Sequence, residues 1–350
     1  MTTPIPFPKA YKAYRRTSGE APLSIEPVTE ELPCSLTPDE VLIRIRAVSL
    51  NYRDAAMLNG KYPSFALDRG IPASDCSAEV IATGKNVSEF KIGDRVAPIF
   101  DLNALEGTEI TKKTLGGDID GVLREYAIFD QKVLVHLPHH LSWEEAACVT
   151  VSGTTAWNSL NMPHAKGTVL LQGTGGVSIF ALLLCLEAGI RVIITSSSDD
   201  KLRKVKDLGP PGSIETVNYK TFPNWEDEVK RLTNGRGVDT VIETGGPTTI
   251  VQSLHSLVRR GTISLIGILG GLHMDQYPDA FTPLLLNTAT IKAIFVGSRT
   301  DQVNLCRYLE DKRITLKPLL DESNFSFEDP QKAFDHLYSA KHVGKVVIKV

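Results

Sequence analysis

The 350-residue sequence has few cysteines and none of the spacings that bind structural metals or build disulfide frameworks. Its five cysteines are odd in number and widely scattered, and no C-x-x-C pair occurs. This pattern favours neither a disulfide scaffold nor a structural zinc site.

Long hydrophobic runs are also missing. No apolar stretch reaches the roughly 18–20 residues that a membrane-spanning helix needs, and the first twelve residues hold three prolines and no apolar core of a secretory signal. We therefore expect no membrane partner and a cytoplasmic location. The formal net charge of −3 gives no electrostatic reason to expect nucleic acid as a partner.

A glycine-rich turn near the middle of the chain is the most informative motif. It follows a predicted apolar strand at residues 169–171 and precedes an apolar segment of helical length. The turn reads Gly173-Thr174-Gly175-Gly176-Val177. In a dinucleotide-binding unit the first glycine permits the tight turn, and the second lets the backbone approach a pyrophosphate at the helix N-terminus. Ser178 stands where the usual G-x-G-x-x-G pattern has its third glycine.

The elements around this turn decide how it is interpreted, because glycine also marks ordinary turns. Strands are predicted at residues 169–171, 192–195, 240–243, 262–266 and 291–296, with helical lengths between most of them. Short β-branched runs separated by helices are typical of a parallel sheet covered on both faces. The sequence therefore predicts an α/β fold with a doubly wound, Rossmann-type domain, and a separate domain before it.

The end of the second predicted strand indicates which dinucleotide binds. An NAD-binding unit usually has Asp or Glu here, whereas this chain has Ser196 and Ser197, with Lys201 within reach of the same pocket. Hydroxyl donors and an ammonium group favour a 2′-phosphate, which a carboxylate would repel. We therefore expect NADP(H), with Asp199 and Asp200 turned outward as helix caps. The alternative is that the serine run only caps the following helix.

The first half of the chain is predicted to be rich in strands. Residues 41–48 alternate apolar and charged side chains, as a half-buried strand does, and further strands are expected at 122–129 and 133–136. Because no regular helices separate them, these strands favour a barrel-like or antiparallel domain.

Short landmarks follow one another in a specific order along the whole chain. They are Asn51-Tyr52-Arg53-Asp54, residues 91–96, 121–126 and 146–157, the glycine-rich turn, Phe295-Val296-Gly297-Ser298-Arg299 and Gly344-Lys345-Val346-Val347-Ile348. In this order they resemble the medium-chain dehydrogenase/reductase superfamily. The resemblance implies a GroES-like β-rich catalytic domain over residues 1–152 and 297–350, a Rossmann NADP-binding domain over 153–296, and an active-site cleft between the two.

The family's zinc-binding positions carry other residues here. The first cysteine ligand falls on Asn51, the histidine on Ser74, and the last cysteine near Val151, with Cys148 close by. Amide and hydroxyl groups do not replace thiolate and imidazole, so we expect no catalytic metal. The chain then resembles the zinc-independent branch of quinone oxidoreductases and enoyl reductases.

That branch implies hydride transfer from NADPH to an α,β-unsaturated carbonyl or a quinone. Hydrogen-bond donors can stabilise the charge that develops on the substrate oxygen, and we predict Asn51, Tyr52 and Arg53 as the catalytic residues. The alternatives are structural. Asn51 would then tie the strand end, Tyr52 would pack in the core, and Arg53 would pair with Asp54.

The resemblance also assigns residues to the cofactor. Thr155 would lie near the nicotinamide, or its hydroxyl would bond the preceding turn of its own helix. Tyr219 would lie beside the 2′-phosphate together with Ser196 and Lys201, or would serve in packing. Backbone groups of Phe295 and Val296 would meet the carboxamide.

Two further cofactor residues follow from their positions. Gly245 comes after a strand whose C-terminal end opens toward the ligand. Arg299 would contact pyrophosphate or substrate, or else form an ion pair with Asp301.

The sequence also allows two alternative functions and predicts an oligomeric state. A zinc-independent alcohol or aldehyde reductase is one alternative, and a non-catalytic NADPH-binding regulatory or structural protein is another. Family members commonly pair through edge strands of the Rossmann sheet. We therefore expect a homodimer, with the strand around residues 291–295 at the edge.

Overall fold

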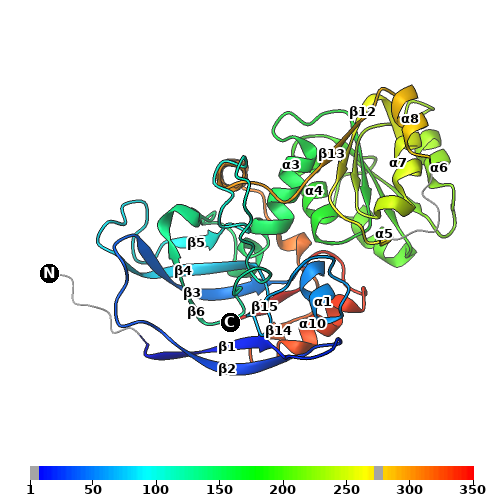
Figure 1. Cartoon of the computed structure of the whole chain (residues 1–350). Helices are drawn as coiled ribbons and strands as arrows, with labels where there is room; N and C mark the ends of the chain where they lie inside the picture. Colours follow the sequence, from blue (N-terminus) through cyan, green and yellow to red (C-terminus); the bar gives the residue numbers. More distant parts are fainter. Residues whose placement is uncertain (1–7, 272–278) are drawn as a thin grey trace. The chain divides into compact units, whose positions relative to one another are not determined.

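The computed structural model describes residues 8–271 and 279–350 and divides into two compact units. Unit 1 comprises Met1–Thr154 and Gly297–Val350, and unit 2 comprises Thr155–Val296 (Figure 1). Unit 2 is thus one continuous stretch inserted into unit 1. Most of the N-terminal segment considered above for a signal lies outside the described residues.

Unit 2 is built on a six-stranded parallel sheet in the order β10-β9-β8-β11-β12-β13. The strands are β8 (Thr168–Gln172), β9 (Arg191–Ser196), β10 (Ile214–Asn218), β11 (Val238–Glu243), β12 (Leu257–Leu265) and β13 (Thr290–Ala293). The order reverses beside β8, the first strand of the set, which is the signature of a doubly wound sheet. The predicted α/β fold is confirmed.

Helices cover both faces of this sheet. Figure 1 shows α3 and α4 on one side and α6, α7 and α8 on the other. The helices of unit 2 are α3 (Thr154–Leu160), α4 (Gly176–Glu187), α5 (Asp199–Lys206), α6 (Trp225–Leu232), α7 (Ile250–Ser256) and α8 (Phe281–Leu286), with a 3₁₀ turn at Gly246–Thr248. Apolar residues of β8, β9 and β11 pack with Trp225, Val229 and Leu254 in one buried cluster. Burial on both faces explains why these strands read as continuous apolar runs.

The strand predicted at residues 291–296 is shorter in the structure. β13 spans Thr290–Ala293 and ends three residues before the predicted limit at Val296. Val296 has φ +60, a left-handed conformation that a β-branched residue seldom adopts and that no strand contains. Its carbonyl oxygen accepts a hydrogen bond of 2.9 Å from Asn158 Nδ2, which holds the backbone in this bend.

A carboxylate clamps the beginning of β8 to β11. Asp239 accepts two hydrogen bonds from Arg236, of 2.8 and 2.7 Å, and one of 2.8 Å from the Thr168 backbone N–H. The bonds from Arg236 lower the pKa of Asp239, the Thr168 N–H acts in the same direction, and partial burial opposes both. Gly167 is required beside this clamp, because a Cβ there would lie 2.1 Å from Asp239 Oδ2.

Replacing Asp239 with asparagine is expected to destabilise unit 2 by about 1–2 kcal/mol at neutral pH, since charge-assisted hydrogen bonds are lost. A carboxyl with a lowered folded-state pKa contributes stability above its unfolded pKa, and this contribution is lost as the pH falls through the folded value. The gap between wild type and Asp239→Asn should therefore close below roughly pH 4. Urea unfolding at a series of pH values measures it, and a gap that persists in acid would contradict the clamp.

Unit 1 contains a seven-stranded sheet and a two-stranded one. The larger has the order β14-β15-β3-β4-β5-β7, with β6 also paired to β3, and the smaller pairs β1 with β2. The strands are β1 (Ala10–Arg16), β2 (Ile25–Glu31), β3 (Glu40–Ser49), β4 (Asp75–Thr83), β5 (Arg95–Pro98), β6 (Tyr126–Asp130), β7 (Leu134–His136), β14 (Phe325–Ser326) and β15 (Val347–Lys349). The pairings are antiparallel except β14–β15, in agreement with the predicted strand-rich domain.

Helices complete unit 1. They are α1 (Tyr52–Leu58), α2 (Trp143–Ala146), α9 (Arg299–Lys312) and α10 (Gln331–Tyr338), with a π-helical turn at Val149–Gly153 and 3₁₀ turns at Gln131–Val133 and Lys317–Leu319. Among the helices of residues 8–271 and 279–350, none combines the length and apolar composition that crossing a bilayer requires.

Candidate active site

Three neighbouring strands of unit 1 bring distant residues to one end of the sheet. β15 and β4 both pair antiparallel with β3, so the end of β3 lies beside the beginnings of β15 and β4. Asn51 follows β3, Ser74 precedes β4 and Lys345 precedes β15. Residues almost 300 positions apart in the sequence therefore meet in one polar network.

The Lys345 ammonium is at the centre of this network. Its Nζ donates to the Leu50 carbonyl oxygen at 2.7 Å and to Asn51 Oδ1 at 2.6 Å. Asp75 Oδ2 lies 3.8 Å from the same nitrogen. Lys345 is only 3% exposed, so its charge is compensated by these oxygens and not by bulk water.

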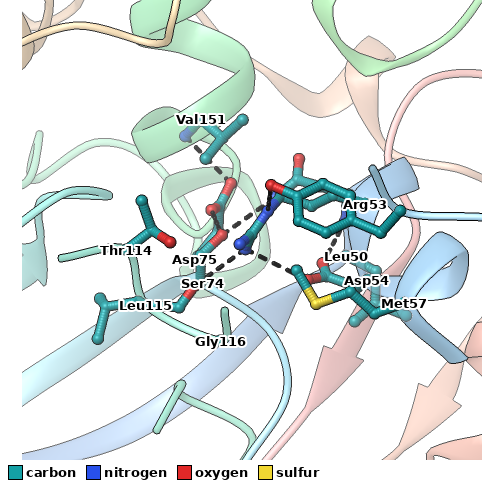
Figure 2. A network of polar contacts seen from close by, with 12 residues as sticks. Leu50, Arg53, Asp54, Met57, Ser74, Asp75, Thr114, Leu115, Gly116 and Val151 are labelled. Carbon is teal, nitrogen blue, oxygen red and sulfur yellow. Dashed lines mark hydrogen bonds and ion pairs between the residues drawn. The ribbon is translucent and has the colours of Figure 1, made fainter. Parts of the chain in front are cut away.

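Asp75 ties the network to a π-helical turn. One carboxylate oxygen accepts from Ser74 Oγ at 2.7 Å, and the other accepts from the Val151 backbone N–H at 3.1 Å (Figure 2). Asn51 Nδ2 lies 3.4 Å from Ser74 Oγ. Asn51, Ser74 and Val151, which lie at or near the positions where the family resemblance places zinc ligands, are thus brought together by the fold.

Arg53 and Asp54 hold the beginning of α1. Asp54 Oδ2 accepts the Asn51 backbone N–H at 2.8 Å, and burial raises the pKa of the Asp54 carboxyl. Arg53 Nη1 donates to the Leu115 carbonyl oxygen at 2.9 Å and lies 3.8 Å from Asp54 Oδ1. The Arg53 guanidinium also stacks over Phe100, 4.9 Å from the ring centroid. These contacts match the structural alternative for Arg53, so we carry only Asn51 and Tyr52 forward as candidate catalytic residues.

Tyr52 does not pack in the core, as its structural alternative proposed. It is the first residue of α1 and is 49% exposed, unlike Met57 and Leu58 on the same helix, which are buried. Its hydroxyl is available to a ligand that approaches the start of α1. Asn51, immediately before it, is half-buried.

In unit 2, the glycine-rich turn has the backbone geometry that the sequence predicted. Gly173 has φ +75, which only glycine adopts without strain, and Gly175 is the N-cap of α4. A Cβ on either glycine would meet open space. The first-turn N–H groups of Gly176 and Val177 have no acceptor within the helix. Ser178 takes the third glycine position and donates to the Gln172 carbonyl oxygen at 2.8 Å.

The serine run at the end of β9 divides into two roles. Ser198 is the N-cap of α5 and accepts the Lys201 N–H, while Asp199 and Asp200 fill the first helical turn. The predicted capping by the two aspartates is thus wrong, because the preceding serine does it. Ser196 is buried at the strand end, where its carbonyl oxygen accepts the Tyr219 backbone N–H at 3.1 Å.

A buried carboxylate that sequence reasoning missed connects two glycine turns of unit 2. Glu243, 0% exposed, accepts from Gln172 Nε2 at 2.7 Å and from the N–H groups of Gly245 and Gly246 at 2.7 and 3.0 Å. Gln172 Oε1 accepts the Thr244 N–H at 2.9 Å. The signal was a polar residue at the last position of two adjacent apolar strands. Glu243 thus fixes the Gly245 turn relative to the Gly173 turn.

Further cofactor candidates, Thr155, Tyr219 and Phe295, lie in separate parts of unit 2. Thr155 is buried at the start of unit 2, and it is the neighbouring Thr154 whose hydroxyl bonds the preceding turn, at 3.4 Å from the Val149 carbonyl oxygen. Tyr219 and Phe295 are both well exposed, and for Tyr219 this exposure does not fit the alternative of a packing role.

Arg299 lies in unit 1, at the beginning of α9. Its Nε donates to the Leu134 carbonyl oxygen at 3.1 Å, and its Nη2 pairs with Glu89. The alternative that Arg299 pairs with Asp301 is wrong, because Asp301 accepts from the Ser298 N–H and completes the capping box of α9 instead.

Comparison with known proteins agrees with this architecture. A model of the alcohol dehydrogenase GroES-like domain matches residues 37–139, and one of the zinc-binding dehydrogenase domain matches residues 176–310. A zinc-type alcohol dehydrogenase-like protein of Schizosaccharomyces pombe is 38% identical over 335 residues, which cover 93% of this chain and 95% of the relative. The chain belongs to the medium-chain dehydrogenase/reductase superfamily.

Two further relatives of this medium-chain dehydrogenase/reductase are informative. A quinone oxidoreductase of Pseudomonas aeruginosa is 31% identical over 243 residues, 68% of each chain. The crystal structure of a Sinorhizobium meliloti protein assigned as an alcohol dehydrogenase superimposes with a TM-score of 0.88 at 32% identity, covering 98% of this chain and 100% of the other. The predicted family and its GroES-like and Rossmann-type domains are confirmed, and the protein is an oxidoreductase.

The donor set of this medium-chain dehydrogenase/reductase does not fit a catalytic zinc ion. In the described ranges, no three His, Cys, Asp or Glu side chains lie close enough together to hold a metal. Cys148 donates to the Glu144 carbonyl oxygen at 3.3 Å, and burial raises the pKa of its thiol to about 11, which opposes the thiolate that zinc requires. The buried Lys345 ammonium would also repel a divalent cation.

A nicotinamide dinucleotide, in contrast, fits unit 2. The open backbone at Gly173 and Gly175 and the N–H groups at the start of α4 form the anion-binding element that a pyrophosphate needs. Binding of such a dinucleotide also fits the family.

Proposed function

We propose that this protein is a zinc-independent reductase that uses NADPH to reduce an α,β-unsaturated carbonyl compound or a quinone. The observation that carries the proposal is the network of Asn51, Ser74 and Lys345, in which amide and hydroxyl groups stand where the family resemblance places metal ligands and the Asn51 amide offers an N–H donor. Similarity to a quinone oxidoreductase supports the acceptor class.

Asn51 has the chemistry to replace a Lewis acid. In an enone, negative charge develops on the carbonyl oxygen while the hydride adds at the remote β-carbon. An amide N–H aimed at that oxygen stabilises the enolate more than the neutral ketone, which lowers the barrier. The Asn51 amide is half-buried, so the donor acts at reduced dielectric.

The reaction balances with one proton. NADPH, when bound, supplies the hydride for the β-carbon. The π electrons of the C=C bond then form a double bond between the α-carbon and the carbonyl carbon, and the C=O π electrons move to the oxygen. A proton at the α-carbon converts this enolate to the saturated ketone. Tyr52 is adjacent to Asn51 and exposed. Its hydroxyl is the candidate group that donates this proton directly or passes it on from water.

The preference for NADPH rests on the end of β9. Ser196 is uncharged and buried there, and its carbonyl oxygen accepts the backbone N–H of Tyr219. Lys201 lies in the first turn of α5. No carboxylate occupies the strand-end position itself, where it would repel a 2′-phosphate.

The test is turnover by the purified protein with NADPH or NADH and a panel of enones, quinones and aldehydes, followed by the absorbance of the reduced nicotinamide. We expect reduction of enones or quinones, a preference for NADPH, and no loss of activity after dialysis against a zinc chelator. Activity with aldehydes alone would favour the alcohol/aldehyde reductase. Tight binding of NADPH without turnover of any acceptor would favour a non-catalytic binding protein.

We also propose a homodimer that pairs through β13. All four residues of this edge strand are exposed, and an edge strand presents unpaired backbone groups to a second copy. Phe281 and Leu285 of the nearby α8 are 82% and 79% exposed. Light scattering should give twice the mass of one chain, and Ile291→Asp should give the monomer. A monomeric wild type would contradict the proposal.

A further inference from the structure

We propose that Lys345 is a positioning residue that orients the Asn51 side-chain amide, so that its N–H₂ group faces the substrate. This inference rests on the proposed function and names a residue that acts through Asn51 without touching the substrate. Lys345 Nζ and Asn51 Oδ1 are 2.6 Å apart, although 294 positions separate the residues in sequence.

The chemistry of the ammonium fixes one orientation of the amide. A lysine ammonium has three hydrogen-bond donors and no acceptor, whereas an asparagine amide has an acceptor at one end and donors at the other. Only the amide oxygen can therefore face Lys345. The flipped amide would place N–H₂ against NH₃⁺ and would leave a buried donor unpaired, which is unfavourable.

The other end of the amide is oriented by a second directional contact. The Ser74 hydroxyl donates its proton to Asp75 Oδ1 at 2.7 Å, so a lone pair of Ser74 Oγ is left for Asn51 Nδ2 at 3.4 Å. Asp75 is held in turn by the Val151 N–H. This contact occupies one hydrogen of Nδ2. The second hydrogen remains for a ligand oxygen.

The backbone around Lys345 is held so that its side chain starts from a fixed point. Gly344 has φ +72, and a Cβ on it would lie 1.9 Å from the Leu319 carbonyl oxygen. The Lys345 N–H donates to that same oxygen at 2.8 Å. A buried cation at hydrogen-bond distance from the amide oxygen also polarises the amide, which strengthens its N–H as a donor.

The experiment compares two substitutions of Lys345 with a matched control. Lys345→Met removes all donors, and Lys345→Gln keeps an N–H donor on a side chain one bond shorter than lysine. Lys349→Met, in the same C-terminal segment, removes an exposed lysine that pairs with Glu144. We expect Lys345→Met to lower kcat for an enone about 10- to 100-fold with the Kd for NADPH unchanged, Lys345→Gln to recover part of the loss, and Lys349→Met to have no effect on kcat.

A double-mutant cycle separates orientation from general structural damage. If Lys345 acts through Asn51, then Lys345→Met should lower kcat no further in an Asn51→Ala background. If the losses of kcat in the two single variants multiply in the double variant, the inference is overturned. It is also overturned if kcat of Lys345→Gln is no higher than that of Lys345→Met. An inactive wild type would instead overturn the proposed function.

An NMR measurement tests the orientation of the Asn51 amide without requiring catalytic activity, and it can be made on whichever Lys345 variant folds. In protein labelled with ¹⁵N at asparagine, the side-chain amide signal of Asn51 is identified by its loss in Asn51→Asp. We expect Lys345→Met and Lys345→Gln each to shift this signal, because the amide oxygen loses its charged donor, and Lys349→Met to leave it in place. An unchanged Asn51 signal in a folded Lys345 variant would contradict the inference.

Discussion

Replacing Asn51 with alanine is expected to lower kcat for an enone about 10²- to 10³-fold, which is the typical effect of removing one donor to a developing oxyanion. The affinity for NADPH should not change, because the dinucleotide-binding elements belong to unit 2. Stopped-flow or steady-state kinetics give kcat, and fluorescence titration gives the Kd for NADPH.

Asn59 provides the matched control for this prediction. It ends the same helix, α1, where its Nδ2 donates to the Ala55 carbonyl oxygen at 2.8 Å. Asn59→Ala therefore removes an asparagine side chain and a helix-capping bond while leaving the polar network intact. A kcat within about threefold of wild type is expected for Asn59→Ala. An equal loss of kcat in both variants would show that α1 matters only as a helix.

The second large effect is a reversal of coenzyme preference by Ser196→Asp. A carboxylate at the end of β9 would repel a 2′-phosphate and would accept a hydrogen bond from a ribose 2′-hydroxyl. Like charges about 4 Å apart at an effective dielectric constant near 20 repel by about 4 kcal/mol. We therefore expect kcat/KM for NADPH to fall by about 10²-fold or more and kcat/KM for NADH to rise.

Ser198→Asp is the control for the change in charge. Ser198 is the N-cap of α5, and aspartate is as good a cap as serine, so the helix should be preserved. The added carboxylate would face the helix N–H groups instead of the strand end. NADPH use that falls equally in both variants would mean that the net charge of this loop, and not Ser196, sets the preference.

Elements with a strong local pattern were predictable from the sequence. β8, β9 and β11 are buried on both faces, so their β-branched and leucine runs stood out against polar flanks. The turn at Gly173 was predictable because its φ of +75 demands glycine. Val296 was misplaced because its bend comes from a hydrogen bond with Asn158, which no local pattern reveals.

The candidate site was only half predictable, for a topological reason. Asn51 could be named from a motif, but nothing near it in sequence points to Lys345, which reaches it because β15 pairs with β3. Glu243 and Gln172 meet in the same way across adjacent strands. Local sequence patterns do not reveal which distant strands pair with one another. The partners that tune a predicted residue are therefore the part that remained hidden.

The place of β15 in the sheet has a consequence for synthesis on the ribosome. β15 lies between β14 and β3, yet it is translated after all of unit 2. A nascent chain can therefore complete unit 2 while the Ala47–Ser49 part of the β3 edge, which β15 covers in the finished sheet, is still open; β6 pairs only with Glu40–Arg44. Until the final strand emerges from the exit tunnel, that edge is a target for chaperones and for aggregation.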